Sequence, residues 1–346
     1  MGSPIKVKGL AQVDVDVNRI GISYSGGGPL VVVELGIAQA FVERHIYPSV
    51  IAGASAGSLA GAAHALDIYD GRGIQMAADV LGHVTNRTLH LDVQDVVGQL
   101  LQQVWRYALQ GPDRLVKELT HNLLGLRSLG DDAPIGPLIH QGIHQTFGLS
   151  DVTFGMFGKP LPGADADHPT PRLIVATTDL RQRQSFWFTP DTTPGSPIEP
   201  ALIASAAIPF VFPWVRWPPG VEPPTQLLVD GGVVENQPLS VLAVDERCGQ
   251  LYACAVGPTG ELPEPRNLLE NLQQSFGLMT HQATKLEEEL LRTRLPEGAM
   301  VCHVHPEMSF GPQDFNFTPE LVRRVMDEAR QKTLAWLDRD HSADCA

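Results

Sequence analysis

The chain alternates short apolar runs with longer stretches of helical periodicity. Apolar runs at 19–24 and 49–52 are each followed by a stretch with helical spacing, at 30–45 and 58–66. Further strands are expected at 172–178, 184–188, 226–229, 251–256 and 299–304, and further helices at 199–206, 238–247, 266–294 and 319–338. This alternation predicts an α/β fold, with a mostly parallel central sheet flanked by helices.

Between residues 70 and 150 the pattern becomes helical only. Its broad apolar stripe consists of Val93, Val96, Val97, Leu100, Leu101, Val104, Trp105, Ala108, Leu115, Leu119 and Leu123. Such a stripe fits a helical subdomain packed over the sheet, and it also fits a lid whose apolar underside opens to lipid. We expect a catalytic domain over 20–244 that includes this insertion, and a C-terminal strand and helix extension over 245–346 that completes the same globular unit.

Two other apolar patterns leave alternatives open. In the helix expected at 266–294, apolar residues alternate at spacings of four and three, namely Leu272, Phe276, Met279, Ala283, Leu286 and Leu290. This seam is compatible with helix pairing, but it is short for a coiled coil, so packing on the helix's own domain is favoured. Four aromatic residues between prolines, Phe210, Phe212, Trp214 and Trp217, could wall a pocket, dip into a membrane interface or anchor a buried loop.

Composition limits the classes of molecule that the protein can bind. The chain has 346 residues and a formal net charge of −14, which argues against general electrostatic binding to nucleic acid or to an anionic membrane. No apolar run reaches the roughly 18 residues of a spanning helix, and the start lacks an apolar signal region. A cytoplasmic protein is expected, with transient and local apolar contact at membranes. A homo-oligomer is compatible with the sequence but nothing requires one.

The four cysteines, Cys248, Cys254, Cys302 and Cys345, are scattered without C-x-x-C or metal-like spacing. Neither a disulfide framework nor a zinc site is therefore expected, and a reducing cytosol fits best. No cofactor or metal is expected.

A candidate nucleophile lies between an expected strand and an expected helix. Residues Gly53 to Gly57 read Gly-Ala-Ser-Ala-Gly and fit G-x-S-x-G. Small residues on both sides let the backbone turn sharply and leave the Ser55 hydroxyl exposed above the sheet edge. Alone the motif is weak, because a plain tight turn has the same composition.

A glycine-rich turn precedes the first helix. Gly26, Gly27 and Gly28 lack Cβ atoms, so successive amides can point at one spot, where an oxyanion would form. An ordinary βα turn is the alternative. A nucleotide-phosphate loop is disfavoured because neither phosphate-binding signature is present.

A serine hydroxyl also needs a base. Asp230 follows an apolar strand and precedes Gly231 and Gly232, which puts a carboxylate at a strand end, where open α/β sheets hold their active sites. A turn aspartate would look the same. His303 or His305 would complete a Ser-Asp-His order, but both lie in a strand-like alternation, so a dyad without histidine is favoured.

Together these segments resemble the patatin-like phospholipase family. Residues 25–28 resemble its oxyanion loop, Gly53 to Gly57 its nucleophile elbow, and Asp230-Gly231-Gly232 its D-G-[GA] motif. Residues 204–213 resemble its S-A-x-x-P-x-x-F-P segment. The resemblance implies that Ser55 and Asp230 form a dyad which cleaves lipid acyl esters through an acyl-enzyme intermediate, without a metal, with Gly26, Gly27 and Gly28 as oxyanion donors.

One position departs from the family pattern. A basic residue and then a glycine usually follow the three glycines, whereas this chain has Leu30 and Val31 there. Two alternatives therefore stay open beside phospholipid hydrolysis. The same dyad could transfer the acyl group to an acceptor other than water, or the chain could be a lipid-binding regulatory protein with weakened catalysis.

Overall fold

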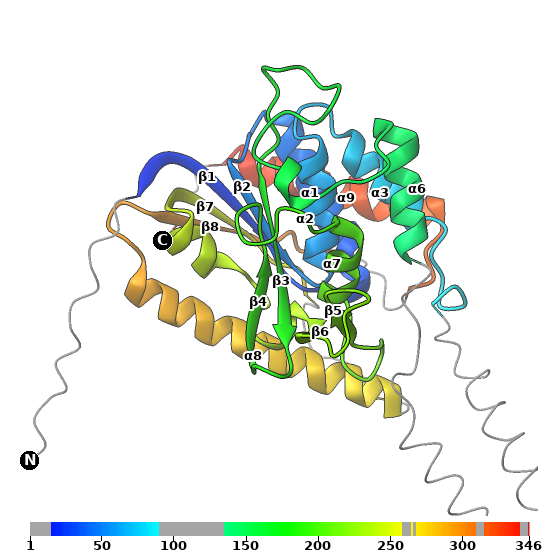
Figure 1. The fold of residues 1–346 in the computed structure, drawn as a ribbon. Helices are drawn as coiled ribbons and strands as arrows, with labels where there is room; N and C mark the ends of the chain where they lie inside the picture. Colours follow the sequence, from blue (N-terminus) through cyan, green and yellow to red (C-terminus); the bar gives the residue numbers. More distant parts are fainter. Residues whose placement is uncertain are drawn as a thin grey trace, which may run out of the picture.

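The computed structural model describes residues 15–89, 135–257, 264–265, 268–308, 315–339 and 345. It confirms the expected fold class, since a central, mostly parallel sheet is flanked by helices (Figure 1). The strands are β1 (Asp16–Tyr24), β2 (Val50–Ala54), β3 (Arg172–Asp179), β4 (Gln184–Phe188), β5 (Val215–Trp217), β6 (Gln226–Asp230), β7 (Cys248–Cys254) and β8 (Met300–Val304).

Helices pack on both faces of this sheet and bury two apolar clusters. They are α1 (Val31–Glu43), α2 (Ala56–Leu66), α3 (Arg72–Leu81), α6 (Ile135–Phe147), α7 (Ile198–Ser205), α8 (Leu268–Arg294) and α9 (Pro319–Leu337). The expected elements are confirmed to within about three residues, with the exceptions given below. The apolar stripe expected between Val93 and Leu123 lies outside the described residues.

The parallel part of the sheet consists of β3, β2, β1, β7 and β8 in that order. Every residue of β2 is buried, as expected for a strand with both faces covered by helices. The C-terminal ends of these strands therefore meet at one edge, which is where the motif at Gly53 to Gly57 begins.

Strand β3 brings two distant parts of the chain together. Its residues Val175 to Asp179 pair with β4, so its other partners must occupy the opposite edge. On that opposite edge β2 pairs as far as Ala176, and antiparallel β6 takes over at Thr177, where Asp230 pairs. The C-terminal ends of β2 and β6 consequently meet head to head along β3.

Three features around β6 differ from expectation. Strand β5 was not predicted, because three residues are too few to show a strand alternation. Strands β4, β5 and β6 pair antiparallel, whereas the parallel strands carry the crossover helices. The helix expected at 238–247 is a short π-helical turn over Val241–Asp245, with apolar residues buried around its circumference rather than along one stripe.

The expected packing of the α8 seam is wrong for two of its members. Met279 and Leu286 are 69% and 57% exposed, whereas Leu291, which lies outside the seam, is buried. Polar residues of α8, namely Thr280, Thr284 and Glu287, are partly buried. Figure 1 shows α8 running beneath the strands. Of the seam residues whose side chains the structure describes, Met279 and Leu286 therefore face solvent and Ala283 is partly buried.

The C-terminal part of the chain packs on the first helix. Helix α9 crosses α1 so closely that a Cβ at Gly36 would lie 2.5 Å from the Met326 carbonyl oxygen. Only glycine allows this approach.

Among the described helices, none combines the length and apolarity that a bilayer span requires.

The expectation that the cysteines are unpaired is wrong for two of them. Cys345 returns to the outer strand β8 and forms an isolated antiparallel bridge with Cys302, and their sulfurs are joined in a disulfide. The two cysteines are 43 positions apart and carry no short-spacing signature, which is why sequence spacing missed the pair. Cys248 and Cys254 are free and buried.

We predict that reduction of Cys302–Cys345 lowers the free energy of unfolding by about 4 kcal/mol, the chain-entropy value for a loop of this length. Chemical denaturation with and without reductant measures the difference, and Cys345→Ser should reproduce it. Non-reducing peptide mass spectrometry should recover the cross-linked pair. Rapid alkylation of Cys345 in the native, unreduced protein would contradict the disulfide.

Candidate active site

Ser55 occupies a strained turn between β2 and α2. Its backbone has φ 51° and ψ −127°, in the left-handed half of conformational space that a serine rarely adopts. A Cβ at Gly53 would lie 2.3 Å from the Gly57 carbonyl oxygen, and one at Gly57 would lie 2.4 Å from the Tyr24 carbonyl oxygen. Both glycines are thus required for the turn, and the Ser55 side chain projects from its tip.

Asp230 ends β6 opposite this turn. The Ser55 hydroxyl donates a hydrogen bond to Asp230 Oδ2 at 2.6 Å, and the Gly232 amide donates to Asp230 Oδ1 at 2.7 Å. A Cβ at Gly231 would lie 2.3 Å from the Ala176 carbonyl oxygen, so the chain can leave β6 here only at a glycine. The structure therefore brings together Ser55 and Asp230, which are 175 positions apart.

Burial dominates the electrostatics of this carboxyl. Asp230 is 1% exposed, and desolvation raises its pKa to about 7, although the hydrogen bonds from Ser55 and Gly232 act in the opposite direction. A carboxylate with a raised pKa is a stronger base than an exposed one. The site thus holds a hydroxyl beside a group that can accept its proton near neutral pH.

The first glycine of the 26–28 loop has a different role from the one expected. The Gly26 amide donates to the Asn236 carbonyl oxygen at 3.0 Å, so it is already engaged and is not free to bind an oxyanion. A Cβ at Gly26 would lie 2.3 Å from Asn236 Oδ1 and 3.1 Å from Ser55 Cβ. Gly26 is therefore needed for close packing of the loop against the nucleophile.

Three other amides remain available at the mouth of the turn. Within the described part of the chain, no protein acceptor is paired with the N–H of Gly27, Gly28 or Ala56. Ala56 is the first residue of α2, whose opening amides have no partner inside the helix. Sequence reasoning missed Ala56, although the residue after the serine of a G-x-S-x-G elbow is a known source of such a donor.

Ser205 fixes the backbone of the nucleophile. Its hydroxyl accepts the Ser55 amide at 3.0 Å and donates to the Ala176 carbonyl oxygen at 2.6 Å. Ser205 is fully buried and ends α7, in the stretch 204–213 that resembles the family segment. One hydroxyl therefore ties the elbow to β3.

A second polar side chain ties the loop after Asp230 to the sheet. Gln237 is buried, and its amide nitrogen donates to the carbonyl oxygen and the hydroxyl of Ser23, at 3.1 and 3.0 Å. Sequence reasoning also missed Gln237, because a single glutamine in a loop gives no recognisable signal. It holds the loop that carries Asn236 next to the end of β1.

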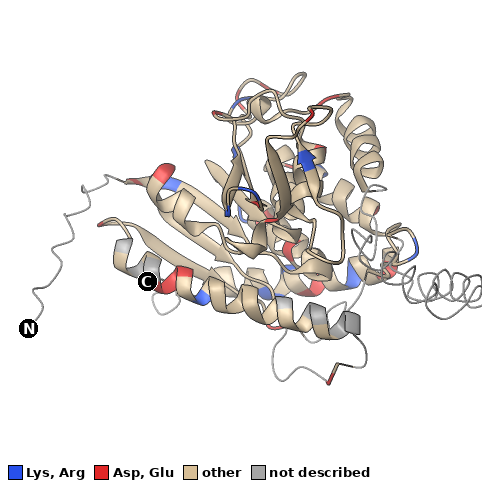
Figure 2. Ribbon diagram, turned by 60° about the horizontal axis from the view of Figure 1, so that its bottom comes forward, with Lys and Arg blue, Asp and Glu red and all other residues tan. Residues whose placement is uncertain are grey.

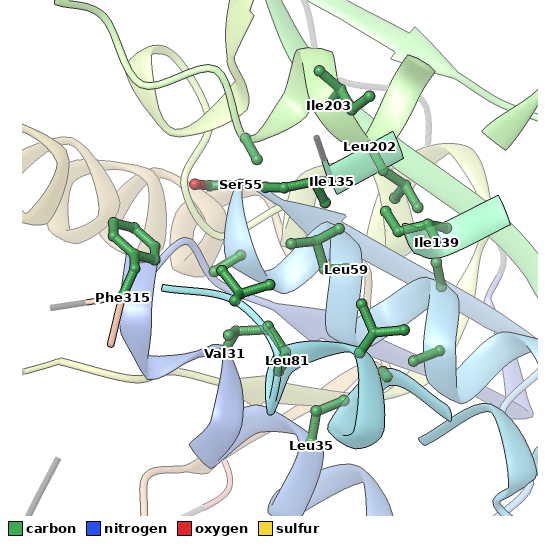
Figure 3. A pocket seen from close by; sticks show the side chains of 18 of the residues that line it. Val31, Leu35, Ser55, Leu59, Leu81, Ile135, Ile139, Leu202, Ile203 and Phe315 are labelled. Carbon is green, nitrogen blue, oxygen red and sulfur yellow. The ribbon is translucent and has the colours of Figure 1, made fainter. Parts of the chain in front are cut away.

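An apolar pocket opens from Ser55 into the helical layer (Figure 3). Ser55 provides the hydroxyl among the described lining residues, and the remainder is almost wholly hydrocarbon. Figure 3 shows side chains from α1, α2, α3, α6 and α7 converging on one space, including Leu35, Leu59, Leu81, Ile139 and Leu202. Phe315 and Phe317, from the C-terminal part of the chain, complete one wall.

The departure from the family pattern falls within this pocket. Val31 lines the cavity, and Leu30 is partly buried against the same apolar cluster. Both side chains thus extend the hydrocarbon surface at the place where family members usually carry a basic residue and a glycine. Their effect on rate and acyl preference stays a prediction.

The four aromatic residues between prolines have different surroundings, and the expected contact with a membrane interface stays a prediction. Phe212 lines the pocket, and Trp217 is buried with its ring 4.8 Å from that of Phe188. Phe210 is 66% exposed and Trp214 is 37% exposed. The stretch therefore supplies a pocket wall, a buried anchor and a solvent-facing ring.

The histidines considered for a triad point to other partners. His303 lies 3.9 Å from Glu288, and His305 bonds the Ala255 carbonyl oxygen at 2.8 Å. His64 on α2 is fully buried beside Tyr24, and burial lowers its pKa to about 3. Among the described residues, no group of three or more His, Cys, Asp or Glu side chains is placed to hold a metal ion.

Comparisons with solved structures find weak likenesses that include the following two proteins. VipD from Legionella pneumophila matches with a TM-score of 0.40 and 15% identity, over 99% of this chain and 72% of that protein. The type III effector protein ExoU matches with a TM-score of 0.41 and 17% identity, over 94% of this chain, which spans about half (53%) of that protein. None of the curated proteins compared with the sequence matches it.

A comparison with family models is decisive. The model described as patatin-like phospholipase matches residues 22–243. This span starts in β1 and ends within the π-helical turn at Val241–Asp245, beyond Asp230. The match includes the glycine loop, the elbow at Ser55 and the Asp230 motif. The chain belongs to the patatin-like phospholipase family.

Proposed function

We propose that the protein is a serine acylhydrolase that cleaves acyl esters of phospholipids or related lipids, with Ser55 as nucleophile and Asp230 as base. The observation that carries the proposal is the 2.6 Å hydrogen bond from the Ser55 hydroxyl to a buried carboxylate at the mouth of a hydrocarbon pocket. Family membership supports lipid acyl hydrolysis in general terms. The apolar lining supports an acyl chain as the group that is bound.

The proposed reaction has two steps. Ser55 Oγ attacks the ester carbonyl carbon while its proton passes to Asp230 Oδ2, and the amides of Gly27, Gly28 and Ala56 stabilise the oxyanion. The C–O bond to the leaving alcohol then breaks, the alcohol takes the proton from Asp230, and the acyl group stays on Ser55. In the second step water attacks the acyl carbon and loses a proton to Asp230. The bond to Ser55 Oγ then breaks, Ser55 takes this proton from Asp230, and the fatty acid is released.

The environment of Asp230 favours this proton transfer. A carboxylate of ordinary pKa is a weak base toward a serine hydroxyl, whereas burial brings the pKa of Asp230 to about 7. Each oxyanion donor typically contributes about 2.7 to 4 kcal/mol to the stabilisation of the transition state. Asp230, a base of raised pKa, therefore accepts the hydroxyl proton, while a fixed set of amides stabilises the oxyanion.

Replacement of either member of the dyad tests the proposal directly. Ser55→Ala removes the attacking oxygen and Asp230→Asn removes the proton acceptor, so both should reduce hydrolysis of a medium-chain nitrophenyl ester to background. Folding should be retained, as judged by circular dichroism. A fluorophosphonate probe should label the wild-type protein at Ser55.

His303→Ala and His305→Ala serve as matched controls and should keep wild-type turnover. Undiminished activity in either dyad variant, or loss of activity in a folded histidine variant, would refute the dyad. Lipid binding without ester turnover or probe labelling would instead indicate a regulatory protein.

The raised pKa of Asp230 predicts the pH dependence of activity. Because the base must be ionised, kcat/KM should rise as pH increases through about 7. The carboxyl binds its proton more tightly in the folded than in the unfolded chain. Ionisation of Asp230 therefore lowers the free energy of unfolding progressively as pH rises from about 4 to about 7. Asp230→Asn should therefore be more stable than wild type above pH 7. Rate profiles and urea unfolding from pH 5 to pH 9 measure the two effects. A flat rate profile would contradict the predicted rise in kcat/KM.

Ser205 is proposed as a positioning residue for the nucleophile. Ser205→Ala leaves the Ser55 amide and the Ala176 carbonyl unpaired, and a small displacement of Ser55 should lower kcat about ten- to a hundredfold with little change in KM. Ser58→Ala is a matched control, since the Ser58 hydroxyl bonds the Ser55 carbonyl oxygen, which also accepts the Ser58 amide. Steady-state kinetics and the rate of fluorophosphonate labelling separate this effect from a loss of stability. Equal kinetics for the two alanine variants would exclude the positioning role.

A further inference from the structure

Phe210 has two unusual properties for an aromatic residue. Its side chain is 66% exposed to solvent, and its backbone has φ 71°, in the left-handed region that bulky residues rarely adopt. Exposure and an unfavourable conformation both cost free energy, and among the described residues this ring gains only limited packing to offset them. A cost of this kind indicates a role outside the folded chain itself.

The position of Phe210 links it to the pocket. It lies at the tip of a tight turn in which the Val211 and Phe212 amides both donate to the Ile208 carbonyl oxygen. Ile208 and Phe212, on either side of the tip, line the pocket that ends at Ser55. The preceding residue of the turn, Ala207, accepts the Asp230 amide at 2.9 Å. The exposed ring is therefore carried on the rim of the proposed acyl pocket.

A second exposed apolar pair follows the other half of the dyad. Val233 and Val234 come directly after Asp230-Gly231-Gly232 and are 36% and 38% exposed. Apolar side chains thus face solvent from both segments that flank Asp230.

Apart from the buried carboxyl of Asp230, the segments around the mouth carry no charged side chain. Residues 24–33, 200–215 and 231–234, which form the glycine loop, the Phe210 turn and the start of the loop after Asp230, contain no Asp, Glu, Lys or Arg. The Lys and Arg residues of the described fold are scattered over several elements (Figure 2). The whole chain carries a net charge of −14 and would be repelled by an anionic surface.

We propose that this rim, comprising Phe210, Val233 and Val234, docks on an electrically neutral lipid surface, with the Phe210 ring inserted among the acyl chains. The inference rests on the proposed function, since it identifies the source from which an acyl chain enters the pocket. Insertion of Phe210 buries its exposed ring, and an uncharged rim avoids the cost of moving a charge out of water. Lipid would then pass from the surface to Ser55 along continuous hydrocarbon.

Vesicle binding in the Ser55→Ala background tests the docking without any turnover. Sedimentation with phosphatidylcholine vesicles should show binding, and Phe210→Gly should weaken it about ten- to a hundredfold, as expected for the loss of one buried aromatic ring. Glycine is favoured at φ 71°, so this variant should be at least as thermally stable as its parent. Val17→Ser is the matched control, because Val17 is 54% exposed near the opposite end of β1 and should leave binding unchanged.

Kinetics separate docking from chemistry. With Ser55 restored, Phe210→Gly should hydrolyse a water-soluble, monomeric short-chain ester at the wild-type rate but lose activity on phosphatidylcholine vesicles. Unchanged vesicle binding by Phe210→Gly, or binding that requires anionic lipid, would overturn the proposal. Absence of ester hydrolysis by the wild-type protein would instead count against the proposed function, while the vesicle measurement still decides whether the rim binds lipid.

Discussion

The site depends on one backbone junction, at Ala176 and Thr177 of β3. Along a single edge of this strand, β2 pairs up to Ala176 and β6 begins to pair at Thr177. The Ala176 carbonyl oxygen accepts the Ser205 hydroxyl and lies against Gly231. A parallel and an antiparallel strand thus end at the same point: Ser55 directly follows the last residue of β2, and Asp230 is itself the last residue of β6.

Glycine is required at positions 53, 57 and 231 because of close packing around this junction, not for chain flexibility. A side chain at positions 53, 57 or 231 would collide with a backbone carbonyl at 2.4 Å or less. Backbone atoms cannot move aside as a flexible side chain can, so these contacts fix the spacing of the elbow and the base. The cost of the strained Ser55 conformation is offset by the hydrogen bonds that surround it.

Much of the fold and the central pair of residues could be predicted from sequence, because apolar periodicity and short motifs are local signals. Strand direction in β4 to β6, the three-residue β5 and the Cys302–Cys345 pair could not, since they depend on pairings between distant segments. The same limit applies within the site. The amide of Gly26 could be assigned to Asn236 only once the loop after Asp230 was in place, and Ser205 could be connected to Ser55 only through β3. In α8 the apolar spacing could not show that Met279 and Leu286 would be exposed while the polar Thr280 and Thr284 would be partly buried.

The pocket wall formed by Phe315 and Phe317 has a consequence for what counts as the catalytic unit. These rings lie beyond residue 243, where the match to the family model ends. They are carried by the segment that leads into α9, and α9 is locked against α1 at Gly36. The family-defining region therefore encloses the reacting groups but not the whole hydrocarbon chamber. Variation among relatives in this trailing segment would alter the chamber while leaving every motif intact.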